Sequence, residues 1–218
     1  DEILKAAFFG RGAIIEGLPL PEGTPFYNPG LAHGLGYDQA KARTLLSAAG
    51  IGSGFSCKLL ATAQYGMHKD TAAVIQQHLG EIGIAVELLL PDWATRVTLG
   101  NRGQYEIGVM GSSSDSNDPD GLAPFLDGSL SPSYNRSYGY NDPKINALLA
   151  AGRAAFDPAK RLAIYDELQR VCLEQVPMIG LCFRAQGYGM AKALTGFRNM
   201  PGALSFYSGT TFEDASTG

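Results

Sequence analysis

Short apolar segments alternate with helical patterns between residues 55 and 109, and this alternation constrains the fold more than any other feature of the chain. The segments with strand character are 55–61, 84–90 and 104–109, and those with helical character are 68–82 and about 93–99. A series of strand, helix, strand, helix and strand forms right-handed crossover units, so we expect an α/β fold with a mainly parallel sheet. The run 84–90 is nearly all apolar, which predicts a strand covered on both faces.

Further elements are predicted on both sides of this unit. Capping residues and apolar spacing predict helices over 1–10, 38–49, 144–155 and 159–175, and a last strand over 178–183 that returns to the sheet. Pro and Gly exclude regular structure from 17–36, which we expect to be a long ordered loop or a wrapping arm. Residues 124–140 are expected to be irregular, and the chain is loop-rich from Gly187 onward.

Composition excludes two classes of partner. The 218 residues are 45% hydrophobic and 17% charged, which suits a globular core. The net charge is −4 and the basic residues are scattered singly, which argues against a nucleic-acid partner. No apolar run approaches the roughly 20 residues of a membrane span, so no direct membrane insertion is expected. Because the chain starts within a helical pattern, we expect a mature protein or a piece of a longer one.

The loop that follows the segment 104–109 is the candidate site. It consists of small polar residues with two carboxylates, Asp115 and Asp118, and open α/β sheets place ligands in such loops. A flexible surface turn explains the same residues equally well. Asp118 precedes a proline, which favours a turn cap, whereas Asp115 suits a cationic group such as an amine. A phosphate nest at Ser112, Ser113 and Ser114 is less favoured because no helical run follows directly.

The sequence lacks the motifs of several classes of enzyme and cofactor-binding protein. No GxSxG, HExxH or P-loop pattern is present, and neither a cofactor nor a metal is expected. His68 and His78 are interpreted as solvated residues of one helix rather than as metal ligands. Cys57, Cys172 and Cys182 are interpreted as buried thiols, with one disulfide or a reactive thiol as the alternatives.

Read in order, several pieces of the chain resemble the C-terminal part of the family 5 extracytoplasmic solute-binding proteins of ABC importers, which include dipeptide-, oligopeptide- and nickel-binding proteins. The pieces are DEILKAAFFGRG at 1–12, the Tyr-Asp-x-x-Lys-Ala pattern at 37–50, LGEIGI at 79–84, Asp92-Trp93, NDPKI at 141–145, and YDELQ at 165–169 with Val176-Pro177. The resemblance implies a lobe of the type II periplasmic-binding-protein fold, with a mainly parallel mixed sheet flanked by helices and long loops.

The resemblance also implies a ligand held between two lobes that close by a hinge. Gly111–Pro119 corresponds to the family loop in which an Asp pairs with the α-ammonium of a peptide, and by position that Asp is Asp115. A carboxylate in a closed cleft binds a cation more strongly than in water. The sequence departs at Ser112, where peptide binders have Trp, and this puts a peptide ligand in doubt.

The ligand-binding residues expected from this reasoning are Asp115, Gly111, Ser112, Ser113, Ser114, Met110, Arg184 and Tyr65. Arg184 ends the last predicted strand, where it would meet a ligand carboxylate. The favoured interpretation is an exposed Arg at a strand end without a role in binding. Tyr65 and Met67 line the same rim or belong to a plain loop. Trp93 is expected to pack at the start of its helix rather than to stack on ligand.

We therefore expect one compact lobe without the N-terminal lobe: a lobe-spanning helix end and a Pro/Gly-rich arm at 1–36, the α/β ligand-binding lobe at 37–186 and a loop-rich segment at 187–218. The implied function is the solute-binding component of an ABC importer in a periplasmic or extracytoplasmic location, from a soluble or lipid-anchored parent. Its partners would be a small solute or short peptide and the ABC permease subunits. The alternatives are a small α/β enzyme that uses Asp115 or Asp118 as acid and base, and an interaction domain without a small ligand.

Overall fold

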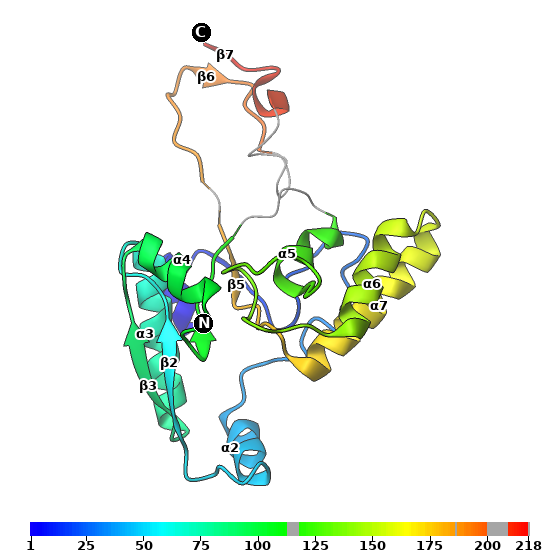
Figure 1. The fold of residues 1–218 in the computed structure, drawn as a ribbon. Coiled ribbons are helices and arrows are strands. Elements are labelled where there is room, and N and C mark those ends of the chain that lie inside the picture. The colour runs from blue at the N-terminus through cyan, green and yellow to red at the C-terminus, as the bar shows by residue number, and fades with distance from the viewer. Residues whose placement is uncertain (113–117, 186, 200–208, 218) are drawn as a thin grey trace.

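The central unit is a parallel sheet of three strands in the order β3-β2-β4 (Figure 1). The strands are β2 (Ser56–Leu60), β3 (Ala85–Leu89) and β4 (Ile107–Gly108), and both neighbours of β2 run parallel to it. The crossovers contain α3 (Gly66–Glu81) and α4 (Trp93–Asn101). The computed structural model describes residues 1–112, 118–185, 187–199 and 209–217. The α/β fold with a parallel sheet, expected from the alternating pattern, is confirmed.

Burial in the sheet is concentrated on the central strand. Leu59 and Leu60 of β2 are fully buried, and Leu59 packs with Ala72 of α3 and with Val109. The prediction that 84–90 is covered on both faces is wrong, because Ala85 and Glu87 of β3 are exposed, whereas Val86, Leu88 and Leu89 are half-buried. Among the described strands, β3 is an edge strand that pairs with β2; Val86 and Leu88 pack against the core of the sheet, and the exposed residues lie on the opposite face.

A helical hairpin forms the second core. It consists of α6 (Pro143–Ala154) and α7 (Pro158–Gln175), and Asp142 and Asp157 cap the two helices through their side chains. The short helices η1 (Pro119–Leu122) and α5 (Ala123–Leu126) pack beside it, and α5 overlaps the start of the stretch 124–140 that the sequence predicts to be irregular. The fully buried side chains of this core include Leu126, Leu149 and Tyr165.

Residues 17–36 form an ordered arm without helix or strand, as predicted. Leu18 and Leu20 are buried in the core of the hairpin, and Asn28 Nδ2 donates to Asp166 Oδ1 of α7 at 3.0 Å. The helix that follows, α2 (Gln39–Ala48), is capped by Asp38 but has no buried residue. Figure 1 shows α2 projecting from the body of the molecule.

The last predicted strand does not return to the parallel sheet. β5 (Cys182–Arg184) instead pairs antiparallel with β1 (Gly12–Ile14) as a separate sheet, with Gly12 opposite Arg184. β1 follows α1 (Glu2–Phe8), and a side chain at Gly12 would collide with the carbonyl oxygen of Phe183. The pairing therefore depends on a glycine that, read along the sequence, argues against a strand.

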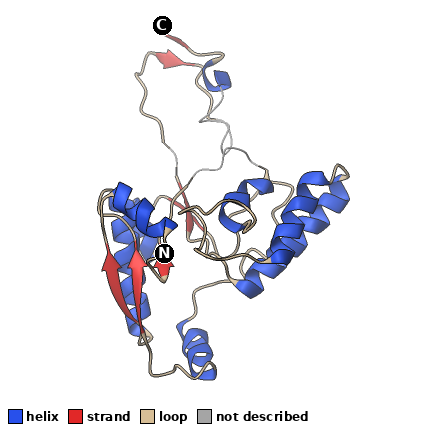
Figure 2. Ribbon diagram, in the orientation of Figure 1, coloured by secondary structure: helices blue, strands red, loops and turns tan. Residues whose placement is uncertain are grey.

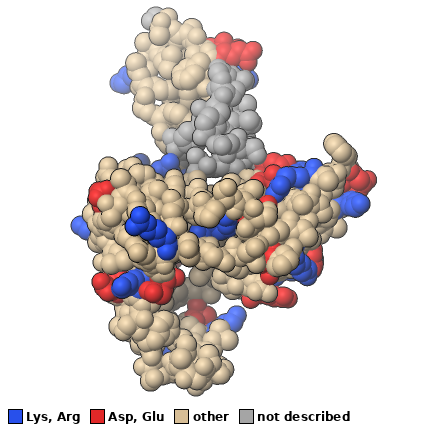
Figure 3. Space-filling model, in the orientation of Figure 1, with Lys and Arg blue, Asp and Glu red and all other residues tan. Residues whose placement is uncertain are grey.

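The C-terminal segment lies apart from both cores (Figure 2). Its described elements are β6 (Leu194–Thr195), η2 (Gly209–Phe212) and β7 (Ser216–Thr217), with β6 and β7 paired antiparallel. In Figure 3, basic and acidic side chains are interspersed over the visible face, without one continuous basic area. No helix within the described ranges has the length and apolar character that a membrane span requires.

Candidate functional site

The carboxyl ends of β2 and β4 meet at one edge of the parallel sheet. Leu60 pairs with Gly108 in the register of the two strands, and the Val109 amide donates to the Leu60 carbonyl at 2.9 Å. The chain leaves β2 through Ala61–Gln64 into α3 and leaves β4 through Met110 into the polar loop. This edge, which we call the β2/β4 edge, is where open parallel sheets bind ligands.

The structure brings several of the predicted site residues to this edge. Met110 is half-buried, and Gly111 and Ser112 are exposed directly after it. Tyr65 occupies the N-cap position of α3 and is 42% exposed. Ser113, Ser114 and Asp115 lie outside the described residues, so their roles stay predictions.

Arg184 approaches the same edge from β5. Its side chain is exposed, and Nη1 lies 3.9 Å from the Sδ of Met67 in the first turn of α3. The antiparallel pairing of β5 with β1, rather than with the parallel sheet, is what delivers Arg184 to the start of α3. Arg184 and the pair Tyr65 and Met67, which the sequence analysis takes from two distant segments, are thus close together in space.

His68 is buried, so the interpretation of this residue as a solvated helix residue is wrong. It is 7% exposed and packs edge-on against Tyr65 and Trp93, with ring centroids 5.7 and 6.2 Å away. Its Nε2 points toward Gly111, where a Cβ would lie 3.1 Å from that nitrogen. The signal was present in the sequence, because His68 precedes Ala72 by four residues and therefore lies on the apolar stripe of the helix.

Burial and two neighbouring positive charges disfavour the protonated form of the His68 imidazole. Burial lowers its pKa first, and the positive charges of Arg96 and Arg184 lower it further. His68 Nδ1 is buried and has no hydrogen-bond partner among the residues that the structure describes.

Arg96 is the centre of an aromatic cluster that the sequence did not single out. It is only 2% exposed, and its guanidinium lies 5.6 Å from the ring centroid of Trp93 and 5.5 Å from that of Tyr134. Nη2 donates to the Val109 carbonyl at 2.8 Å and Nη1 to the Tyr134 carbonyl at 3.2 Å. Arg96 therefore fixes α4 to the end of β4 and to the segment around Tyr134.

Trp93 packs at the start of α4, as the sequence predicts. Its ring contacts Tyr65 at 5.4 Å and Tyr134 at 5.5 Å between centroids, in edge-to-face geometry. The half-buried indole thus forms a wall beside Tyr65 at the β2/β4 edge.

Asp118, the second carboxylate of the predicted loop, belongs to a structural ion pair. It caps η1 by accepting from the Asp120 amide, and it accepts two hydrogen bonds from Arg161 at 2.7 and 2.8 Å. These hydrogen bonds from Arg161 hold the pKa of Asp118 below its ordinary value. A carboxylate held ionised in this way is a poor general acid, which weakens the enzyme alternative at this residue.

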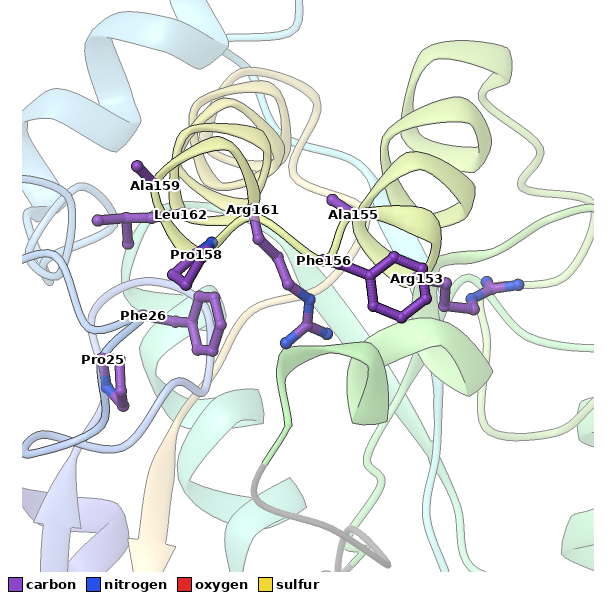
Figure 4. Close-up of a pocket in the computed structure, with 9 residues that line it drawn as sticks. All are labelled: Pro25, Phe26, Arg153, Ala155, Phe156, Pro158, Ala159, Arg161 and Leu162. Carbon is purple, nitrogen blue, oxygen red and sulfur yellow. The ribbon is translucent and has the colours of Figure 1, made fainter.

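A separate open groove of about 680 Å³ lies at the turn between α6 and α7 (Figure 4). Its walls include Phe26, Leu162 and Phe156, and the Phe156 side chain is 98% exposed. The two arginines that line it, Arg153 and Arg161, are already paired with aspartates. The groove shares no lining residue with the β2/β4 edge.

The three cysteines, interpreted from the sequence as buried thiols, are buried at two positions of three. Cys57 and Cys172 are buried, Cys182 is half-buried, and all three are free thiols. Within the described ranges, no group of three or more His, Cys, Asp or Glu is arranged to hold a metal ion.

Comparison with known proteins places the chain in a family. Residues 1–134 match the model of the bacterial extracellular solute-binding proteins, family 5 Middle. Over 225 residues the chain is 30% identical to the glutathione-binding protein GsiB of Pectobacterium atrosepticum, covering 99% of this chain and 42% of the relative. It is 27% identical to a dipeptide-binding protein of Pseudomonas aeruginosa over 177 residues, covering 79% of this chain and 33% of the relative.

Solved structures of solute-binding proteins also align with the chain. The structure of AgaA from A. tumefaciens in complex with agropinic acid aligns over 100% of this chain and 44% of that one, with 40% identity and a TM-score of 0.87. HbpA2 from Haemophilus parasuis aligns over 99% of this chain and 42% of its own, with 25% identity and a TM-score of 0.83. The type II periplasmic-binding-protein fold is confirmed, and the chain spans less than half the length of these relatives. The chain belongs to family 5 of the bacterial extracellular solute-binding proteins.

Proposed function

We propose that the protein is the solute-binding component of an ABC importer, and that its ligand binds at the β2/β4 edge. The observation that carries this proposal is the convergence of Tyr65, His68 and Arg184 with the end of β4, at the edge where parallel sheets bind ligands. Family membership supports the transport role, and the relatives are named as binding proteins, which gives the enzyme alternative no support.

The proposed ligand is a small polar solute. GsiB is named for glutathione, and AgaA was solved with agropinic acid. Ser112 replaces the Trp that the resemblance predicts for peptide binders, which favours a ligand other than a simple dipeptide. The 40% identity to AgaA makes agropinic acid the first ligand to test.

The proposed binding residues are those of the sequence analysis. Met110 and Gly111 form the floor at the end of β4, and Tyr65 forms a side wall with Trp93. Asp115 is proposed to pair with a cationic group of the ligand, on the resemblance alone. Because this lobe offers an open edge, a second lobe would be needed to exclude water from the ligand.

The proposed location is extracytoplasmic, with the ABC permease subunits as partners. The family is named extracellular, and a structural relative is described as an ABC transporter-associated periplasmic binding protein.

Ligand binding to the full-length protein tests the proposal. Calorimetry and thermal shift with agropinic acid, glutathione and the dipeptide Met-Leu should find a ligand that raises Tm with concentration and is recovered unchanged. Asp115→Asn should weaken a ligand with an ammonium group by about 1.5–3 kcal/mol, the range for charge-assisted hydrogen bonds. Glu22→Gln, which removes an exposed carboxylate in the 17–36 arm, is the control. Turnover of the ligand would contradict the receptor function.

A further inference from the structure

We propose that the open groove at the turn between α6 and α7 is a contact surface for a second copy of this chain, with Phe156 of each copy seated in the groove of the other. We call this surface the α6–α7 groove (Figure 4). It shares no lining residue with the β2/β4 edge, so the contact is independent of the proposed ligand site. Three observations carry the proposal: a projecting ring, a preformed apolar wall opposite it, and a rim that bears both charges.

The first observation is a phenylalanine ring that lies almost wholly in water. Phe156 is 98% exposed, although burial of a phenylalanine side chain is strongly favourable. It is the middle residue of the connector between Ala155, the C-cap of α6, and Asp157, the N-cap of α7. Asp157 caps α7 with its side chain, and Pro158 confines it to extended backbone. The connector is therefore held against α7, and this fixes the direction in which the ring projects.

The second observation is an apolar wall on the other side of the groove. Figure 4 shows Phe26 and Leu162 on one side and Phe156 on the other, across an open volume of about 680 Å³. The Phe26 ring packs edge-on against Tyr165, with 5.3 Å between the ring centroids, and the Arg161 guanidinium lies 5.2 Å from the Phe26 centroid. Because these contacts hold the wall in place before association, less conformational entropy is lost when a second ring enters.

The cations that line the groove are neutralised within the chain. Arg161 pairs with Asp118, and Arg153 pairs with both Asp120 and Asp127. Neither guanidinium needs an anionic partner from outside. The groove therefore favours an apolar occupant such as an aromatic ring over an acidic one.

The rim favours a second copy over other apolar partners. Asp157 and Lys160, at the start of α7, are both exposed and carry opposite charges. In a two-fold symmetric pair the same patch meets itself, so Lys160 of one copy can face Asp157 of the other. The ring of Phe156 and the wall opposite it are likewise complementary, and each is used twice in such a pair. A rim of a single sign would instead repel its own copy.

Sedimentation velocity of the full-length protein tests the contact between about 1 μM and about 500 μM, the range in which small interfaces associate. Phe156→Ser removes the ring, Phe156→Tyr keeps one, and Leu162→Glu puts a charge into the wall. Phe9→Ser, which removes a ring that is 90% exposed at the end of α1, is the matched control. Lys160→Glu tests the rim, with Lys41→Glu on the exposed surface of α2 as its control.

The wild-type protein should show an equilibrium between monomer and dimer that depends on concentration. Phe156→Ser and Leu162→Glu should each weaken dimerisation at least about 10-fold, because each change acts twice in the symmetric pair. Lys160→Glu should weaken it about two- to fivefold, as expected for exposed charges. Phe156→Tyr, Phe9→Ser and Lys41→Glu should leave it within about twofold of wild type.

A protein that stays monomeric over the whole range overturns the inference, as does a dimer that Phe156→Ser leaves intact. At a concentration where the protein is monomeric, Phe156→Ser should leave the free energy of unfolding in urea unchanged, because the ring is exposed. A loss of stability there would show that the groove is covered within one copy, which also overturns the inference. So would a monomer that carries an apolar solute in native mass spectrometry. None of these outcomes bears on ligand binding at the β2/β4 edge, so the proposed function stands or falls separately.

Discussion

Arg161 donates two parallel hydrogen bonds to Asp118, at 2.8 Å from Nη1 and 2.7 Å from Nη2. Asp118 begins η1 at the C-terminal end of the polar loop, and Arg161 lies on α7. The same guanidinium lies 5.2 Å from the ring centroids of both Phe26 and Tyr165. One side chain thus joins the loop, the helical hairpin and the 17–36 arm, so we expect it to matter for stability rather than for catalysis.

Arg161→Lys should lower the free energy of unfolding by about 1–2 kcal/mol. Lysine keeps the charge but loses the two-point geometry and the stacking on both rings. The expected loss lies below that of a fully buried pair, because the Asp118 side chain is 39% exposed. Urea denaturation of the full-length protein measures it. Arg170→Lys, in an exposed pair with Glu167, should cost less than about 0.5 kcal/mol; equal costs for the two variants would contradict this role.

The contribution of the Asp118 carboxylate should disappear in acid. Its pKa is lower in the folded protein than in the unfolded chain, so its ion pair stabilises the fold fully above about pH 4. As the pH falls through the folded pKa, the carboxylate is protonated and this stabilisation is lost. The difference between wild type and Arg161→Lys, measured in urea at pH 7 and at pH 3, should therefore shrink toward the lower pH. A difference that grows in acid would contradict the lowered pKa of Asp118 in the folded protein.

Folding of the β2/β4 edge should be sensitive to mild acid through His68. Burial first, then Arg96 and Arg184, lower the pKa of His68 in the folded protein below the value of the unfolded chain. Below about pH 6.5 the unfolded chain takes up a proton that the folded His68 resists, so stability falls as the pH falls. His68→Phe should show a flatter Tm profile between pH 5 and pH 7. Above pH 7.5 the two profiles should run parallel, and parallel profiles down to pH 5 would refute the prediction.

Much of the sheet could be predicted because it depends on local patterns. The strands around Cys57 and Val86 and the helices between them follow apolar periodicity, and Asp38 caps its helix as expected. The pairing of β5 with β1 could not be predicted in this way, because a strand of three residues has no pattern that specifies its partner strand. β1 was hidden because Gly12, which weakens a strand locally, is required by the close approach of Phe183.

The candidate site was predicted in part. Met110, Gly111, Tyr65 and Arg184 follow from strand ends, which local sequence marks. His68 and Arg96 could not be predicted as residues of the site, because a polar residue on a helix is usually solvated and their burial depends on tertiary contacts. The rings of Trp93 and Tyr134 that cover Arg96 are separated by about forty residues of sequence, and no periodicity connects them.

Two glycines should respond to alanine in opposite ways. Gly54 has a φ of +84°, and a Cβ at this position would overlap the carbonyl oxygen of Gly83. Gly54→Ala should therefore destabilise the protein at the start of β2 by more than about 2 kcal/mol, roughly the sum of backbone strain and a lost close contact. Gly80 lies in α3 with open space around its Cβ position. Gly80→Ala should be neutral or stabilise by up to about 1 kcal/mol. Urea denaturation of both variants measures the contrast, and a similar loss in both would contradict it.

The three thiols should resist alkylation in the native protein, and Cys172 should resist it most. The thiolate is the reactive form, and burial, with Asp142 nearby, raises the pKa of Cys172 to about 12. Burial also raises the pKa of Cys57 and of Cys182, but Cys182 is only half-buried and should react first. Iodoacetamide at pH 8 followed by peptide mass spectrometry measures the order. In urea all three should be modified at once, because the structure holds them as free thiols. A disulfide-linked pair of these peptides, or fast native labelling of Cys172, would contradict the packing of the α6–α7 core around that side chain.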